Sequence, residues 1–195
     1  MGKRLALFDF DGTLTTSDTL LGFAAHAVGR WRCLSALLQS MPHIILWKLG
    51  FISNAVAKQY LFRRLYRGVE LQKLRRKGIG FIPAIDSLLR PEAYKAMRGH
   101  IASGDTVVIV SAAIDFRIEA WARKERVSKV IATEPEVDEE GKLTGSFVTP
   151  NCYGAEKVGR LRLSFPDLDK YEIVAYGNSR GDREMLALAD RAVRF

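Results

Sequence analysis

Two aspartates separated by one residue stand at the end of the first apolar run of the chain. Residues 5–7, Leu-Ala-Leu, predict a short buried strand, and Asp9 and Asp11 follow it with Gly12 behind them. Glycine adopts backbone angles closed to other residues, so Gly12 permits a turn at this point. Two acids then converge at the carboxyl end of a strand, where open α/β sheets place their sites. In such a pair, one carboxylate serves as nucleophile or metal ligand and the other as general acid and base.

Two further residues suit an anionic ligand. Ser111 closes the apolar run 105–111 and is followed by Ala112, Ala113 and a helical pattern. A hydroxyl and free N–H groups at a helix start bind anions, although a serine there is also an ordinary helix cap. Lys157 lies in the first turn of a predicted helix, where it opposes the helix dipole. This favours a functional role, the alternative being an exposed lysine.

The other elements needed to position these residues predict a parallel sheet. The run 170–177 is a second β-branched strand and ends just before Asn178 and Asp182. Further strands are expected at 129–133 and 191–195, and a hairpin at 136–148 with its turn at 139–141. Helices are expected near 82–103, 114–126, 155–165 and 181–189. Strands alternating with helices indicate βα units.

Residues 18–80 contain no convincing strand and are predicted to form about four helices. We interpret them as a cap inserted between the first strand and the rest of the core. An insertion at the carboxyl end of a strand lies over the site, where it excludes water and selects substrates.

Composition narrows the classes of partner. The chain has 195 residues with 48% apolar content, and its net charge of +8 suits phosphate-bearing partners such as nucleic acid, anionic membranes or small phosphate esters. Cys33 and Cys152 fit neither a disulfide framework nor a zinc site, so we expect reduced thiols in a cytoplasmic protein. The start of the chain shows no signal-peptide pattern.

Four segments taken in order resemble the motifs of the haloacid dehalogenase superfamily: residues 8–14 (FDFDGTL), the strand ending in Ser111, the segment 151–157 and the segment 176–186. The chain looks most similar to the phosphoserine-phosphatase-like branch, subfamily IB. This resemblance implies a Rossmann-like three-layer α/β/α sandwich with a parallel sheet and a helical cap of the C1 type. The core domain would comprise 1–17 and 81–195, and the cap domain 18–80.

The same resemblance implies a mechanism. Asp9 would attack phosphorus and form an aspartyl-phosphate, while Asp11 would act as general acid and base. Ser111 and Lys157 would be catalytic and, with Ala112, would bind the phosphoryl group. Asp18 would face the rest of the substrate.

A Mg²⁺ ion would complete this site. Its ligand set would be Asp9, Asp11 through the backbone carbonyl, Asn178 and Asp182, the last orienting metal-bound waters. Asn178 departs from the family pattern, which has an acid at this position. Amide oxygen is a competent but uncharged ligand, so weaker Mg²⁺ binding is expected, with a non-catalytic phosphate-binding protein as an alternative.

The leading hypothesis is therefore a cytoplasmic Mg²⁺-dependent hydrolase of a small phosphorylated metabolite. Asp18 stands where phosphoserine phosphatase has Glu, which argues against phosphoserine itself. A phosphatidylglycerophosphate-like lipid phosphate is the alternative, because the segment 31–52 is apolar and contains Pro42. Packing within the cap is the more ordinary interpretation of this segment.

A basic cluster between 63 and 77 is interpreted as a solvated face or as a peripheral contact with an anionic membrane. No recognition motif accompanies it, so nucleic-acid binding is not expected. Nothing in the sequence assigns an oligomeric state.

Overall fold

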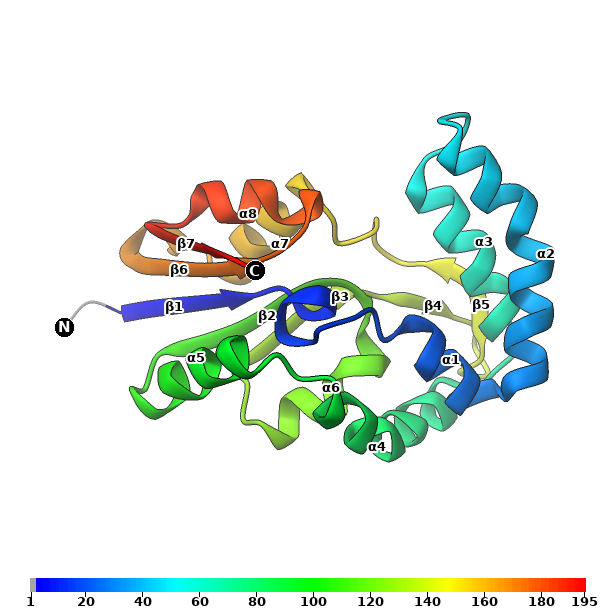
Figure 1. Cartoon of the computed structure of the whole chain (residues 1–195), viewed down its shortest axis with the longest axis horizontal. Coiled ribbons are helices and arrows are strands. Elements are labelled where there is room, and N and C mark those ends of the chain that lie inside the picture. Colours follow the sequence, from blue (N-terminus) through cyan, green and yellow to red (C-terminus); the bar gives the residue numbers. More distant parts are fainter. Residues whose placement is uncertain (1–2) are drawn as a thin grey trace.

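The computed structural model describes residues 3–195 and has a central parallel sheet between two layers of helices (Figure 1). Five strands form the sheet in the order β3-β2-β1-β6-β7, and all of their pairings are parallel. Their bounds are β1 Lys3–Phe8, β2 Thr106–Ile114, β3 Lys129–Thr133, β6 Tyr171–Gly177 and β7 Arg191–Arg194. The predicted three-layer α/β/α fold with a parallel sheet is confirmed.

Alternating side chains of the strands supply the two faces of the core. On one face Phe8 and Ile109 pack with helices α5 Pro91–Ala102 and α6 Asp115–Lys124. On the other face Leu7 and Val110 pack with helices α7 Ala155–Ser164 and α8 Arg183–Leu188. Both faces are buried, which explains why the strands are nearly continuous apolar runs.

Four helices lie between β1 and α5: α1 Leu20–Val28, α2 Arg30–Lys48, α3 Asn54–Tyr66 and α4 Leu71–Ser87. They form the helical layer beyond the carboxyl ends of β1 and β2 (Figure 1), as the sequence predicted. The expected cap boundary at residue 80 falls inside α4. The expected helix 82–103 is two helices, because the chain turns at 88–90 and α5 restarts with Pro91 at its first position.

The predicted hairpin is present as β4 Pro135–Val137 and β5 Leu143–Phe147, which pair antiparallel around Gly141. It packs against the cap: Phe62 of α3 and Phe147 have ring centroids 4.6 Å apart. The backbone of Leu143 also exchanges hydrogen bonds with Gly68 and Val69. The hairpin therefore ties the helical layer to the strand-bearing part of the chain.

No helix within residues 3–195 has the length and hydropathy needed to cross a membrane.

Helices α4 and α6 touch closely at Gly78, so a substitution there tests how they pack. A Cβ built on Gly78 would lie 2.6 Å from the backbone oxygen of Phe116. We expect Gly78→Ala to lower the free energy of unfolding by about 1–3 kcal/mol, because backbone must move to admit the methyl group. Urea unfolding measures this change.

Gly99→Ala, in α5, is the matched control, since its Cβ would meet nothing within 4 Å. It should raise the unfolding free energy by about 0.5–1 kcal/mol through helix propensity alone. Equal effects of the two substitutions would contradict the described contact between α4 and α6.

Candidate active site

The turn after β1 is built around Gly12. The backbone N–H of Asp9 donates to the carbonyl of Tyr176 at 3.0 Å, which continues the β1–β6 pairing up to the turn. Gly12 has φ 81°, in the left-handed region, and a Cβ there would lie 2.2 Å from Nδ2 of Asn178. Both the conformation and the close approach of Asn178 therefore require glycine. The Arg90 side chain donates to the carbonyls of Gly12 (3.1 Å) and Thr13 (3.3 Å), which holds the turn from the side of α5.

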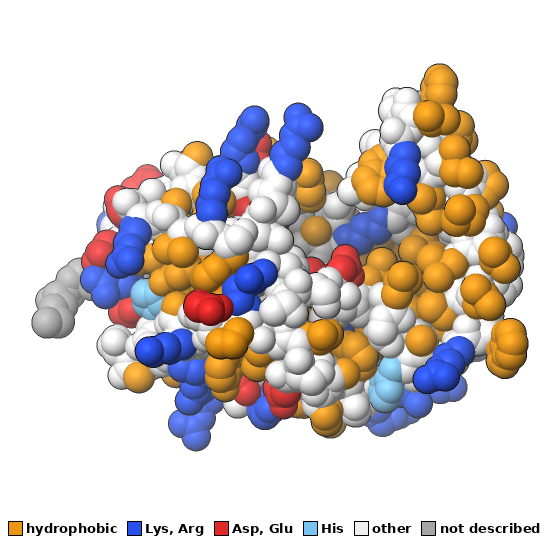
Figure 2. All heavy atoms as spheres, viewed as in Figure 1, with side chains coloured by type: hydrophobic (Ala, Val, Ile, Leu, Met, Phe, Trp, Pro, Cys, Tyr) orange, Lys and Arg blue, Asp and Glu red, His pale blue; other side chains and the backbone are white. Residues whose placement is uncertain are grey.

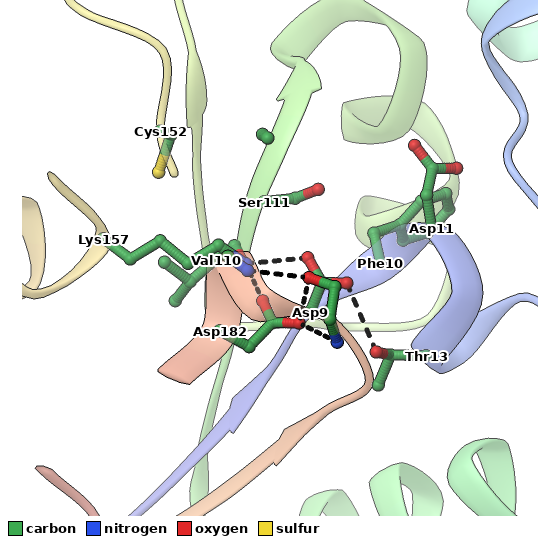
Figure 3. A network of polar contacts seen from close by, with 12 residues as sticks. Asp9, Phe10, Asp11, Thr13, Val110, Ser111, Cys152, Lys157 and Asp182 are labelled. Atoms are coloured by element: carbon green, nitrogen blue, oxygen red, sulfur yellow. Dashed lines mark hydrogen bonds and ion pairs between the residues drawn. The ribbon is translucent and has the colours of Figure 1, made fainter. Parts of the chain in front are cut away.

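Lys157 joins the two buried carboxylates of the site (Figure 3). Its Nζ donates to Oδ1 of Asp9 at 2.7 Å, to Oδ1 of Asp182 at 2.6 Å and to the carbonyl of Val110 at 2.7 Å. All three charged side chains are buried. Burial alone would lower the pKa of Lys157, but Asp9 and Asp182 outweigh it and hold that pKa above its ordinary value. The lysine predicted from the sequence is therefore a charged group at the centre of the site.

The two carboxyl groups hydrogen-bonded to Lys157 have pKa values shifted in opposite directions. Burial would raise the pKa of Asp182, but the charge of Lys157 and hydrogen bonds from Lys157 and Ser179 hold it below its ordinary value. Burial raises the pKa of Asp9, Lys157 opposes that rise, and the charge of Asp182 adds to it. Two carboxylates facing one ammonium leave an excess negative charge in a buried site, which favours a further cation.

Asn178 lies beside Asp9 at the turn. The Thr13 hydroxyl is 3.2 Å from both Oδ2 of Asp9 and Oδ1 of Asn178, so these two oxygens face the same small region. Within residues 3–195, no three Asp, Glu, His or Cys side chains gather as a metal-binding group. A metal held here would use Asp9 together with amide, carbonyl or water oxygen, which are ligands that suit Mg²⁺.

Asp182 fixes the loop after β6. Its Oδ2 accepts hydrogen bonds from the backbone of Asn178 (3.2 Å) and from both the backbone (2.8 Å) and hydroxyl (2.7 Å) of Ser179. Because Oδ1 is bonded to Lys157, both oxygens of Asp182 are already engaged. Its visible role is to position Lys157 and Asn178.

Asp11 faces the cap. Its Oδ2 accepts from Nη2 of Arg117 at 2.5 Å, and its Oδ1 accepts from the backbone and hydroxyl of Thr19 at 2.9 and 2.8 Å. Figure 3 shows its carboxylate pointing away from Asp9 and Lys157. The two aspartates of the turn therefore take different directions, Asp9 toward the buried lysine and Asp11 toward the cap.

Ser111 lies inside β2 rather than at its end. The strand continues to Ile114, and its pairing with β3 shifts register between Val110 and Ile114. Ser111 therefore precedes helix α6 by several residues and is not the helix cap that the sequence allowed. Its Oγ accepts from the backbone N–H of Ala113 at 3.1 Å. The register shift takes the backbone at Ala112 out of the regular ladder, beside the site.

A cavity of about 570 Å³ opens over these residues between core and cap. Asp9, Ser111, Lys157 and Asp182 line its polar floor, and Asp11 and Asp18 line it near α1. Its cap side is mostly apolar, made by Leu20, Leu21, Leu37, Ile44, Trp47, Ala57 and Leu61, with Asn54 and Lys58 as the polar exceptions. Of the predicted site residues, Asn178 is exposed beside the turn and does not line the cavity, and Asp18 is largely exposed at the cavity edge.

Comparisons with known proteins agree with this architecture. The family model described as haloacid dehalogenase-like hydrolase matches residues 6–187. The chain belongs to the haloacid dehalogenase-like hydrolases. Protein CicA of Caulobacter vibrioides is 35% identical over 193 residues, covering 95% of this chain and 83% of CicA.

Solved structures of similar fold include a Bordetella pertussis protein of unknown function. It has a TM-score of 0.84 and 25% identity, with 100% of this chain and 90% of that chain covered. A phosphoserine phosphatase, solved as a phospho-aspartyl intermediate analogue, has a TM-score of 0.61 and 18% identity, with 100% and 87% covered. This chain thus shares its fold with a phosphoserine phosphatase.

Two cations of the cavity were missed by the sequence analysis. Arg117, on α6, is buried and reaches Asp11, and its Nη1 lies 3.6 Å from Asp18. Its Nε and Nη1 make no hydrogen bond within the described part of the chain. Lys58, on α3, donates to the carbonyl of Ala112 and to Oδ1 of Asn151 (2.6 Å). Burial, with the charge of Arg117 adding to it, lowers the pKa of Lys58 to about 8. Both are ordinary helix residues in sequence, and only the tertiary packing of α6 and α3 brings them to the site.

The pairing of Lys157 with two carboxylates predicts a large stability effect. Lys157→Met should lower the free energy of unfolding at neutral pH by about 3–5 kcal/mol, because it leaves buried charges uncompensated. The loss should shrink as pH falls, since the carboxylates, with raised pKa values in the variant, then bind protons more readily in the folded state. Chemical denaturation at several pH values measures both effects.

Lys170→Met is the matched control. Lys170 forms an exposed ion pair with Asp167 at 2.9 Å. Its removal should change the unfolding free energy by less than about 1 kcal/mol. A Lys157 variant as stable as this control at neutral pH would contradict the described charge network.

Proposed function

We propose that this protein is a Mg²⁺-dependent phosphomonoester hydrolase that acts through an aspartyl-phosphate intermediate. The observation that carries the proposal is Asp9, held by Lys157 on the floor of a cavity that Ser111 and Asp11 also line. Membership of the haloacid dehalogenase-like hydrolases supports it. A phosphoserine phosphatase of the same fold has been solved as a phospho-aspartyl intermediate analogue, which is consistent with the same chemistry.

In the proposed reaction, Asp9 attacks phosphorus in line and the ester oxygen leaves. Lys157 orients the attacking carboxylate and, with Ser111 and the backbone at Ala112, binds the phosphoryl oxygens as their charge redistributes. Asp11 protonates the leaving oxygen, then takes a proton from the water that hydrolyses the aspartyl-phosphate. Arg117 and Thr19 hold Asp11 on the cap side of the floor, which is the side where a leaving group would lie.

Mg²⁺ fits the donor set. Asp9, Asn178 and the backbone carbonyl of Asp11 would hold it, and Asp182 would position the loop that carries Asn178. The excess negative charge beside Lys157 supports binding of a cation, and the neutral amide of Asn178 reduces its affinity relative to a carboxylate. When bound, Mg²⁺ neutralises charge on the phosphoryl oxygens and on Asp9.

The substrate we propose is a small phosphorylated metabolite with a second anionic group. Lys58 and Arg117 are two cavity cations beyond Lys157, and Lys58 is paired only with neutral oxygens in the described structure. A carboxylate or second phosphate near them would gain charge-assisted hydrogen bonds. Asp18, beside Arg117, lies where it would contact the remainder of the substrate.

A lipid phosphate is the second candidate, favoured by the apolar cap side of the cavity. Residues such as Leu37, Ile44 and Trp47 suit a hydrocarbon portion better than a polar one. A cytoplasmic location is proposed for either substrate, since Cys33 and Cys152 are both buried free thiols.

Phosphate release from an aryl phosphate, with Mg²⁺ titrated from zero, tests the proposal. Asp9→Asn should reduce kcat at least about 10³-fold, because it removes the nucleophile, and should keep the native circular dichroism spectrum. Asp167→Asn, at an exposed position, should leave kcat unchanged.

Asn178→Asp should lower the Mg²⁺ concentration at half-maximal activity, since it adds a charged ligand. Full activity of Asp9→Asn, or turnover independent of added Mg²⁺ and of chelator, would contradict the proposal. Activity seen only in Asn178→Asp would instead indicate a phosphate-binding protein.

The state of Lys58 predicts a pH effect on binding. For 4-carboxyphenyl phosphate, KM should rise as pH increases through about 8, because Lys58 loses its proton there. Lys58→Met should raise KM about tenfold below that pH and flatten the profile, the loss expected for one charged hydrogen bond. Phenyl phosphate, which lacks the carboxylate, should show neither effect.

Lys95→Met, on α5 outside the cavity, is the matched control and should behave as the native chain. Equal KM changes for the two substrates in Lys58→Met would rule out a role in binding the second anion.

A further inference from the structure

The outer face of α2 is an apolar stripe open to solvent. Exposed hydrophobic side chains recur along this helix at spacings of three and four residues, which places them on one face: Trp31, Leu34, Leu38, Met41, Ile45 and Leu49. The opposite face of α2 packs into the cap through Cys33, Ala36 and Ser40. Trp31 is 85% exposed, and Phe51, in the turn after the helix, is 75% exposed.

Isolated exposed hydrophobic residues are ordinary, but a continuous stripe ending in aromatic side chains marks a contact surface. Figure 2 shows hydrophobic side chains gathered over this part of the molecule. We call this surface the α2 face, defined by the six stripe residues and Phe51.

The surroundings of the α2 face are strongly basic. Between Asp18 and Glu70 the chain has no acidic residue, although Asp and Glu number 22 in the whole sequence. Arg30 and Lys48, at the two ends of α2, are exposed beside the stripe. Four further arginines, Arg32, Arg63, Arg64 and Arg67, line a separate surface pocket with Tyr60, between α2 and α3. An apolar stripe flanked by cations is the pattern of a helix that lies in the headgroup region of an anionic bilayer.

The charge of this region also indicates whether a lipid bilayer or a second copy of this chain covers the α2 face. Two α2 faces packed together would bring the same arginines near one another, without acidic residues of this region to pair with them. An anionic lipid surface offers phosphate groups to those arginines and a hydrocarbon boundary to Trp31 and Phe51. Aromatic side chains favour that boundary.

The α2 face adjoins the active-site cavity. Leu37, Ile44 and Trp47 belong to the same helix and line the cavity from its cap side. Contact of α2 with a membrane would therefore bring the cavity close to the lipid headgroups.

We propose that the α2 face docks on anionic lipid membranes, with its hydrophobic stripe at the acyl boundary and the neighbouring arginines on the headgroups. This proposal goes beyond the proposed function, because binding to a membrane needs no turnover. Membrane docking is compatible with either candidate substrate, the small phosphorylated metabolite or the lipid phosphate.

Flotation of the full chain with vesicles tests the proposal. Vesicles of phosphatidylglycerol and phosphatidylcholine in equal parts should carry the protein, and pure phosphatidylcholine should carry at least about tenfold less. High salt should weaken the binding, since it screens the arginine contacts. Absence of flotation with the anionic vesicles, or equal flotation with both, would overturn the proposal.

Two variants locate the contact. Leu38→Glu combined with Leu49→Glu should reduce flotation about tenfold or more, because both side chains are exposed on the stripe. Leu163→Glu is the matched control, since Leu163 is 83% exposed on α7 of the core.

The basic side chains are tested separately. Arg64→Glu should weaken binding, while Arg123→Glu, on α6, should not. Equal flotation of stripe and control variants would overturn the assignment to this face.

Sedimentation equilibrium and the aryl phosphate assay separate the remaining outcomes. A dimer of the native chain that the stripe variant abolishes would show that a second copy covers the α2 face, and would overturn the proposal. Hydrolysis of aryl phosphate by the stripe variant should equal that of the native chain. A failure of docking is therefore distinguishable from a failure of the proposed phosphatase activity.

Discussion

The buried ammonium of Lys157, shared between two buried carboxylates, is the interaction on which the rest of this site depends. Its partners come from three separate segments, Asp9 after β1, Val110 in β2 and Asp182 after β6, and Lys157 itself lies on α7. Removing such charges from water is expensive unless each is paired and hydrogen-bonded. The sheet order brings these segments together, because β1 lies between β2 and β6. The charge network thus links the topology of the sheet to the position of Asp9, the nucleophile of the proposed reaction.

The two aspartates of the first turn illustrate how surroundings assign different roles to identical groups. Asp9 is buried against Lys157, whereas Asp11 is turned to Arg117 and Thr19 at the boundary with the cap. A nucleophile must be held still beneath the phosphoryl group, and an acid must reach the leaving oxygen above it. The cavity has a related division: Asp9, Lys157 and Asp182 lie on its floor, and its cap side is mostly apolar, with Lys58 as the charged exception.

Much of the fold and of the site floor could be predicted from the sequence, since the signals were local. Buried strands were visible as β-branched runs. Asp9, Lys157 and Asp182 follow strands or begin helices, and in a parallel sheet these positions lie together at one edge. Element limits were less predictable. The continuation of β2 beyond Ser111 depends on its pairing with β3. The break before α5 did have a local signal in Pro91, which the expected helix 82–103 overran. Arg117 and Lys58 carry no local signal, because tertiary packing of α3 and α6 brings them to the cavity.

The stereochemical course at phosphorus tests the assignment of Asp9 as the nucleophile. A phosphate ester made chiral with oxygen isotopes and sulfur would be hydrolysed in isotopically labelled water, and the configuration of the released thiophosphate determined. Attack by Asp9 followed by attack of water is two in-line displacements, each of which inverts the configuration at phosphorus, so overall retention is expected. Overall inversion would mean that water attacks the substrate directly, and would contradict the assignment of Asp9 as nucleophile.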